Sequence, residues 1–181
     1  MGLLLAPVKS ARVAVVPYDA AWAARFAAER ALLERVLAPW ASGGIHHVGS
    51  TAIPGLAAKP IVDVVAGVRD LDESRAAFAP LADASYVPDP HRPGIAHHFA
   101  KPAATSPEYG LHLTEPGSDL WRERLVFRDA LLADGALRAE YEDLKHELAR
   151  RHPHDVDAYT SGKCAFVERV LARAGLGLGR R

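Results

Sequence analysis

The chain has little cysteine, no net charge and no long apolar run. A single cysteine, Cys164, among 181 residues rules out an internal disulfide framework and favours a reducing compartment, so we expect a cytoplasmic protein. The 22 basic and 22 acidic residues balance, which argues against both a basic nucleic-acid scaffold and an acidic disordered tail. Charged residues interrupt every apolar stretch before the ~20 residues that cross a bilayer. The apolar residues 1–7 are too few for a signal-peptide core. We therefore expect a soluble, folded protein.

Several widespread active-site signatures are also missing. The sequence contains no GxxxxGK[ST] phosphate loop, no GxGxxG fingerprint and no GxSxG turn around a nucleophilic serine. These absences exclude the ordinary P-loop, dinucleotide-binding and serine-hydrolase interpretations.

The residues that are present predict an α+β fold. An apolar stripe from Trp22 to Leu37 predicts a helix, and the segment 71–81 predicts another. Strands are predicted near 45–49, 61–66, 86–87, 97–101 and 109–115, with an extended segment at 12–16 and a loop at 88–94. A helical hairpin over 120–148 turns at Asp134-Gly135, and a last helix covers 155–174. This order predicts one domain over residues 1–181, a mixed sheet flanked by helices, with a strand-rich part at about 12–116 and a C-terminal helical block at about 118–175.

Asp63 is the one charged residue in the apolar run 61–66. Alternation along a strand puts it on the face of Ile61 and Val65, where an unpaired carboxylate would be strongly unfavourable. It therefore needs a cation, a group of hydrogen-bond donors, solvent or a divalent metal ion. A metal site and a structural pair with an Arg or Lys fit the sequence equally well.

A turn of Gly49, Ser50 and Thr51 follows the predicted strand at 45–49, with Ser50 13 residues before Asp63. Glycine lets backbone N–H groups approach phosphate oxygens closely. Lys59 precedes Pro60, which favours extended backbone at the entrance of the next strand, where the ammonium can face an anion. The alternatives are an ordinary turn and a lysine that only solvates a loop.

Histidines and further cations are the remaining candidates. His112 lies between Leu111 and Leu113, so its imidazole faces away from the core, where it can bind a metal ion, move a proton or serve as a structural histidine. The adjacent histidines at 46–47 and 97–98 point to opposite faces, so only one of each pair can face a site. Cations for phosphate recognition, or ordinary surface residues, are Arg122, Arg124, Arg128 and Lys163.

One string of residues is highly specific. Residues 47–63 read HVGSTAIPGLAAKPIVD. The string resembles the GrpB family (UPF0157-like), bacterial proteins assigned to the nucleotidyltransferase superfamily, and the likeness covers nearly the whole chain. Further matching positions are 15–19, Trp22, Phe26, 111–113, 127–129, Tyr141, 144–145, 159–160, 162–163 and Phe166.

The resemblance implies a site as well as a fold. In the superfamily a Gly-Ser turn binds triphosphate, a strand with an acid-x-acid pattern holds two magnesium ions, and a later strand carries a third acid. Gly49-Ser50 matches the turn and Asp63 the first acid, but Val65 occupies the place of the second. His112 lies where the third acid is expected, and the family's usual His-Leu-His reads Gly-Leu-His at 110–112. Because in-line transfer relies on two metal ions, the missing acid favours a single-metal site.

The expected site follows from these matches. The catalytic candidates are His47, Asp63 and His112, with Asp63 and His112 as ligands of Mg²⁺, and the phosphate-binding candidates are Gly49, Ser50, Thr51, Lys59, Arg128 and Lys163. We expect a nucleotidyltransferase-like protein that binds a nucleotide or phosphorylated small molecule and transfers a nucleotidyl or phosphoryl group. The alternative is a non-catalytic nucleotide-binding or accessory module, as in relatives fused to dephospho-coenzyme A kinase. The neutral overall charge favours a small-molecule pocket over an extended nucleic-acid surface.

Overall fold

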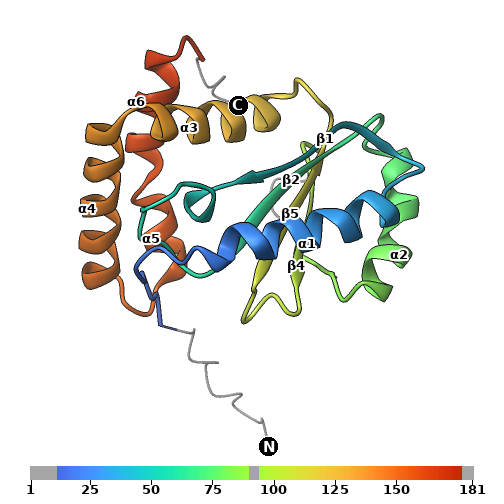
Figure 1. Cartoon of the computed structure of the whole chain (residues 1–181), viewed down its shortest axis with the longest axis horizontal. Coiled ribbons are helices and arrows are strands. Elements are labelled where there is room, and N and C mark those ends of the chain that lie inside the picture. The colour runs from blue at the N-terminus through green and yellow to red at the C-terminus, as the bar shows by residue number, and fades with distance from the viewer. Residues whose placement is uncertain (1–11, 90–93, 177–181) are drawn as a thin grey trace, which may run out of the picture.

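A five-stranded mixed sheet forms the centre of the computed structural model, which describes residues 12–89 and 94–176 (Figure 1). Its strands are β1 (Ala41–Val48), β2 (Val62–Val68), β3 (Val87–Pro88), β4 (His97–Lys101) and β5 (Tyr109–Thr114), and their order is β1-β2-β5-β4-β3. Strands β2 and β5 are parallel, whereas the other neighbours are antiparallel. The predicted mixed sheet and α+β class are therefore confirmed.

Helices flank the sheet and extend beyond one end of it. They are α1 (Ala21–Val36), α2 (Phe78–Asp83), α3 (Asp119–Ala133), α4 (Gly135–Arg151), α5 (Val156–Ser161) and α6 (Cys164–Arg173), with short 3₁₀ helices η1 (Ser50–Ala52) and η2 (Glu73–Ala77). Between α3 and α4 the Asp134 side chain accepts hydrogen bonds from the N–H groups of Ala136 and Leu137. This N-cap begins α4, the second helix of the predicted helical hairpin. No helix within 12–89 and 94–176 is long and apolar enough to cross a membrane.

Two local predictions were wrong. The helix predicted over 155–174 is two helices, α5 and α6, which meet at Gly162 and Lys163. A Cβ at Gly162 would lie 2.4 Å from a methyl carbon of Leu148, so close packing on α4 fixes this junction. The helix predicted over 71–81 is η2 followed by the short α2. The extended segment 12–16 forms a single bridge, between Val16 and Ala58. Part of the loop predicted at 88–94 lies outside the described residues.

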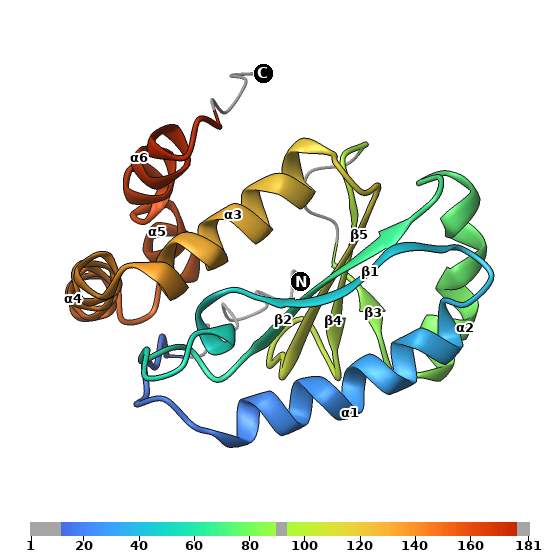
Figure 2. The same cartoon turned by 45° about the horizontal axis from the view of Figure 1, so that its top comes forward.

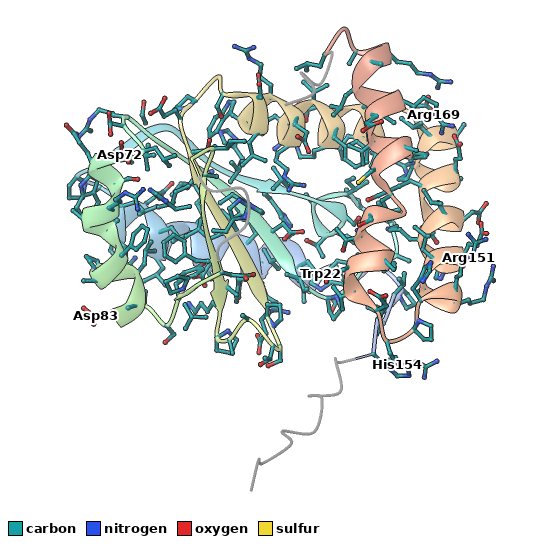
Figure 3. The ribbon with its side chains drawn as sticks, turned by 180° about the vertical axis from the view of Figure 1, so that it is seen from behind. Trp22, Asp72, Asp83, Arg151, His154 and Arg169 are labelled. Carbon is teal, nitrogen blue, oxygen red and sulfur yellow. The ribbon has the colours of Figure 1, made fainter. Side chains whose placement is uncertain are left out.

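The two faces of the sheet differ in what covers them. Residues paired across strands share a face, so the register groups Val64 with Leu111 and Asp63 with Gly110. The first group packs under α1 and α2, in a core that includes the buried Trp22 labelled in Figure 3, and we call this the α1 face. Helix α3 lies across the opposite side near β1 and β2 (Figure 2), and we call it the α3 face. Asp63 and His112 both lie on the α3 face.

Candidate functional site

The carboxylate of Asp63 is packed between two glycines. A Cβ at Gly49 would lie 2.5 Å from Asp63 Oδ2, and a Cβ at Gly110 would lie 2.9 Å from Oδ1. Gly49 has φ 69°, a conformation that residues with side chains rarely adopt. These two glycines let Asp63 lie against the backbone of both neighbouring strands, at the end of β1 and the start of β5.

Three cations act on this carboxylate from separate elements. They are Arg124 of α3, Lys59 of the loop before β2, and Lys163 at the junction of α5 and α6. Burial raises the pKa of Asp63, and the three cations lower it by less, so the net shift is upward. The Nε atom of Arg124 is buried and has no hydrogen-bond partner in the part of the chain that the structure describes. A buried guanidinium N–H without an acceptor is suited to an anion.

The two lysines share one aromatic ring. The Nζ atoms of Lys163 and Lys59 lie 4.4 Å and 5.7 Å from the ring centroid of Tyr159, which is buried. Burial lowers the pKa of Lys163 to about 8, a shift that Lys59 increases and Asp63 opposes. The ring therefore holds two ammonium groups close together beside a single carboxylate.

Ser50 of the predicted phosphate turn faces the same group of residues. A side-chain hydrogen bond joins Ser50 to Tyr141 of α4. Burial raises the pKa of Tyr141 to about 12, Ser50 and Arg124 oppose the shift, and Asp63 adds to it. The Asp63 cluster, as we define it, consists of Gly49, Ser50, Lys59, Asp63, Arg124, Tyr141 and Lys163. With three cations and one acid, it attracts anions.

His47 and Thr51 lie outside this cluster. His47 pairs with Val64 and therefore lies on the α1 face, where its ring stacks on Phe26 with centroids 4.7 Å apart. Burial, with a smaller contribution from Arg128, lowers its pKa to about 4. Its Nε2 lies 3.0 Å from Thr51 Oγ1, and that hydroxyl donates to the Ile61 carbonyl. The structure does not bring His47 together with Asp63, because alternation along β1 turns it to the other face.

Arg128 makes its contacts within the protein, and His112 lies on the same face of the sheet as Asp63. Arg128 donates to the His47 carbonyl at 3.1 Å and pairs with Asp129, so it ties α3 to β1. His112 lies on the α3 face and pairs with Val65 across β2 and β5. This pair lies two residues further along each strand than the pair of Asp63 and Gly110. Its ring packs edge-on against His98 with centroids 4.4 Å apart.

The donor set limits the kind of metal site. Within 12–89 and 94–176, no group of three or more His, Cys, Asp or Glu side chains is placed to hold a metal ion. One carboxylate does fit Mg²⁺ when phosphate oxygens of a ligand complete its coordination. A two-metal centre does not fit, because Val65 follows Asp63 on the same face of β2.

The sequence offered Arg124 only as one of four possible phosphate cations or surface residues and Tyr141 only as a position that matches the GrpB family, so neither was placed in the expected site. The spacing of Arg124 and Arg128 places both on one face of α3, which is a signal for shared orientation toward the sheet. Tyr141 lies on the buried stripe of α4 with Leu137, Lys145 and Leu148, so its spacing indicates only a core position. No sequence feature connects it to Ser50.

The architecture is similar to nucleotidyltransferase folds. The solved structure of the GLD-2/RNP-8 complex matches with a TM-score of 0.54 at 14% identity, covering 83% of this chain and 60% of that chain, a likeness of fold alone. The family model described as GrpB protein matches residues 12–173, and the chain belongs to the GrpB family. The crystal structure of the conserved protein GrpB from Enterococcus faecalis matches with a TM-score of 0.81 at 26% identity, covering 89% of this chain and 96% of that one.

Relatives differ in their total length. The glutamate-rich protein GrpB of Alkalihalophilus pseudofirmus is 33% identical, and the match covers 91% of this chain and 97% of the relative. UPF0157 protein YqkA of Bacillus subtilis is 30% identical over 87% of this chain, which spans 46% of YqkA. A dephospho-CoA kinase of Mycolicibacterium paratuberculosis is 32% identical over 92% of this chain and 47% of its own length. The domain therefore occurs both alone and within longer proteins.

Proposed function

We propose that the protein binds a nucleotide or a related phosphorylated small molecule at the Asp63 cluster, with Mg²⁺ at Asp63, and transfers a nucleotidyl or phosphoryl group. The observation that carries the proposal is the buried Nε of Arg124, which has no hydrogen-bond partner among the described residues, at a carboxylate that Lys59 and Lys163 also face. Phosphate oxygens are the acceptors that such a set of donors fits.

Each residue would have a distinct part in the transfer. Lys59, Lys163 and Arg124 would neutralise the phosphates and the pyrophosphate that leaves, and Ser50 would orient them. A Mg²⁺ ion at Asp63 would supply charge stabilisation at the phosphoryl oxygens. An acceptor hydroxyl would attack phosphorus while its proton passes to a base on the α3 face, for which His112 is the candidate.

Titration calorimetry with several nucleoside triphosphates, with and without Mg²⁺, tests the proposal. We expect Mg²⁺-dependent binding by the wild-type protein that Asp63→Ala abolishes and Arg124→Met weakens at least about tenfold. The matched control is Asp143→Ala, which removes an exposed carboxylate from α4. Binding that ignores both Mg²⁺ and Asp63 would contradict the proposal, and turnover needs a separate assay of product formation.

A second candidate function is that of a non-catalytic accessory module. It is favoured by Val65, which leaves one acid where in-line transfer commonly uses two, and by the dephospho-CoA kinase relative that carries a similar region. This candidate predicts nucleotide binding at the Asp63 cluster without turnover in any combination of nucleotide, metal ion and acceptor.

A further inference from the structure

Three neighbouring side chains of α4 form hydrogen bonds with η1 and with the loop that joins η1 to β2. Tyr141 bonds to Ser50, the first residue of η1. The Glu142 Oε2 atom accepts from the Ala57 N–H at 3.1 Å, and the Lys145 ammonium donates to the Ala57 carbonyl. Both backbone groups of Ala57 are therefore held by side chains less than one helical turn apart on α4.

The next residue, Ala58, is held by a second segment of the chain. Ala58 donates to the Val16 carbonyl at 2.9 Å and accepts from the Val16 N–H at 2.8 Å. All four backbone groups of Ala57 and Ala58 thus have fixed partners immediately before Lys59. The ammonium of Lys59 extends from a backbone that has little freedom to move.

Packing alone does not require an ammonium at position 145. Lys145 is 1% exposed and lies on the buried stripe of α4 with Leu137, Tyr141 and Leu148. Burial lowers its pKa to about 7, so the charged form is destabilised there. A methionine of similar length would fill this space, so the lysine adds polar contacts: the bond to the Ala57 carbonyl and a cation–π contact with Tyr141, 5.0 Å from the ring centroid.

We infer that Glu142 and Lys145 are positioning residues that fix Lys59, and with it the arrangement of cations that receives the phosphates of the ligand. The inference rests on the proposed function, because it assumes that the Asp63 cluster binds phosphate. Neither side chain needs to touch the ligand, since each acts through Ala57.

A double-mutant cycle separates positioning from general destabilisation. The probe is inorganic triphosphate, measured by titration calorimetry at one salt concentration. We expect Lys59→Ala to weaken binding about tenfold in the wild-type background but less than about threefold in the Lys145→Met background. Equal losses in the two backgrounds, with both proteins folded by circular dichroism, would overturn the inference.

A second test compares two variants of Glu142, one that removes the acceptor for the Ala57 N–H and one that keeps it. Glu142→Ala should weaken triphosphate binding, and Glu142→Gln, which keeps an acceptor for the Ala57 N–H, should restore at least half of the lost affinity on a logarithmic scale. The control is Glu147→Gln on the same helix. Glu147 pairs with Arg151, whose side chain lies at the outer side of α4 (Figure 3), so this change should leave binding unchanged. A Glu142→Gln protein as weak as Glu142→Ala would contradict the inference.

Amide hydrogen exchange distinguishes this inference from the proposed function. If the wild-type protein binds neither nucleoside triphosphates with Mg²⁺ nor inorganic triphosphate, the proposed function fails, and exchange at residues 57–59 decides the positioning role. We expect faster exchange there in Lys145→Met and Glu142→Ala but not in Glu147→Gln. Unchanged exchange in the first two variants would overturn the inference whatever the binding result.

Discussion

The buried Lys145 makes the stability of the protein depend on pH in a defined direction. Its pKa is lowered from 10.5 in the unfolded chain to about 7, first by burial and then by Lys163, while Glu142 opposes the shift. The folded state therefore binds fewer protons than the unfolded state between these two values. Stability must rise with pH across this window, and the penalty for the charged lysine is fully present below about pH 7.

The size of this effect follows from the two pKa values. Each unit of pKa difference corresponds to about 1.4 kcal/mol, so the full penalty is about 5 kcal/mol. From about pH 6 to about pH 9 roughly 3 kcal/mol of it disappears. Lys145→Met removes this titration but leaves the buried carbonyl of Ala57 without its donor, which costs about 1–3 kcal/mol at every pH.

Urea unfolding, monitored by circular dichroism, measures the free energy of unfolding of the wild-type protein and of Lys145→Met at each pH. The free energy of unfolding of wild type minus that of Lys145→Met should rise by about 3 kcal/mol between about pH 6 and about pH 9. The matched control is Arg150→Met, which removes a positive charge from an exposed position of the same helix and should show no comparable trend. A difference between wild type and Lys145→Met that does not change with pH would refute the reasoning.

Two further stability predictions concern other parts of the sheet. Gly49→Ala places a Cβ 2.5 Å from Asp63 Oδ2 at φ 69° and should lower the midpoint of urea unfolding by the equivalent of about 1–3 kcal/mol. Gly55→Ala, also at positive φ but with no atom within 4 Å, should lose less, and an equal loss would show that Asp63 is not packed as described. Lys101→Met leaves the buried Glu29, whose two carboxylate oxygens it contacts at 2.9 and 3.1 Å, without its cation and should lower stability by about 3–5 kcal/mol in the same assay. A loss under about 1 kcal/mol would contradict the assigned pair, and adding Glu29→Leu should recover part of a larger loss.

The elements that the sequence predicts well are those fixed by local pattern. The strands predicted at 97–101 and 109–115 match β4 and β5 closely, and the turn at Asp134 follows from its capping side chain. The break at Gly162 could not be predicted, because it depends on contact with Leu148, a residue of another helix. Helix formation in the interval 155–174 is a local property, whereas its interruption is a tertiary one.

The residues of the Asp63 cluster were predicted in part for the same reason. Gly49, Ser50, Lys59 and Asp63 fall within one short string, so sequence distance was a fair guide to spatial distance. The face of His47 was harder to predict, because β1 has an irregular register between Ala41 and Ile45 and is packed on both sides. Pattern alone then does not select the side on which each residue of β1 lies.

That Arg124 and Tyr141 belong to the Asp63 cluster could be seen only in the folded structure. They come from α3 and α4, whose residues meet Ser50 and Asp63 only after the helical block closes over the end of the sheet. A positive charge in an amphipathic helix is ordinarily a surface residue, and an aromatic residue on its buried stripe is ordinarily core. Their part in the Asp63 cluster is therefore a property of the assembled chain.

The Asp63 cluster lies at the junction between the sheet and the helical block, and the same loop and helices form both. Ile53 and Leu56, from the loop that follows Ser50, are buried in an apolar cluster with Leu131 of α3 and Phe166 of α6. The same loop carries Lys59, while the block contributes Arg124, Tyr141 and Lys163. A protein with equal numbers of acidic and basic residues thus concentrates three cations around one acid, because each cation is delivered by a different element. Changes that loosen the packing of Ile53 or Leu56 should consequently weaken anion binding as well as stability, since this packing holds Lys59 of the loop near Arg124 and Lys163 of the block.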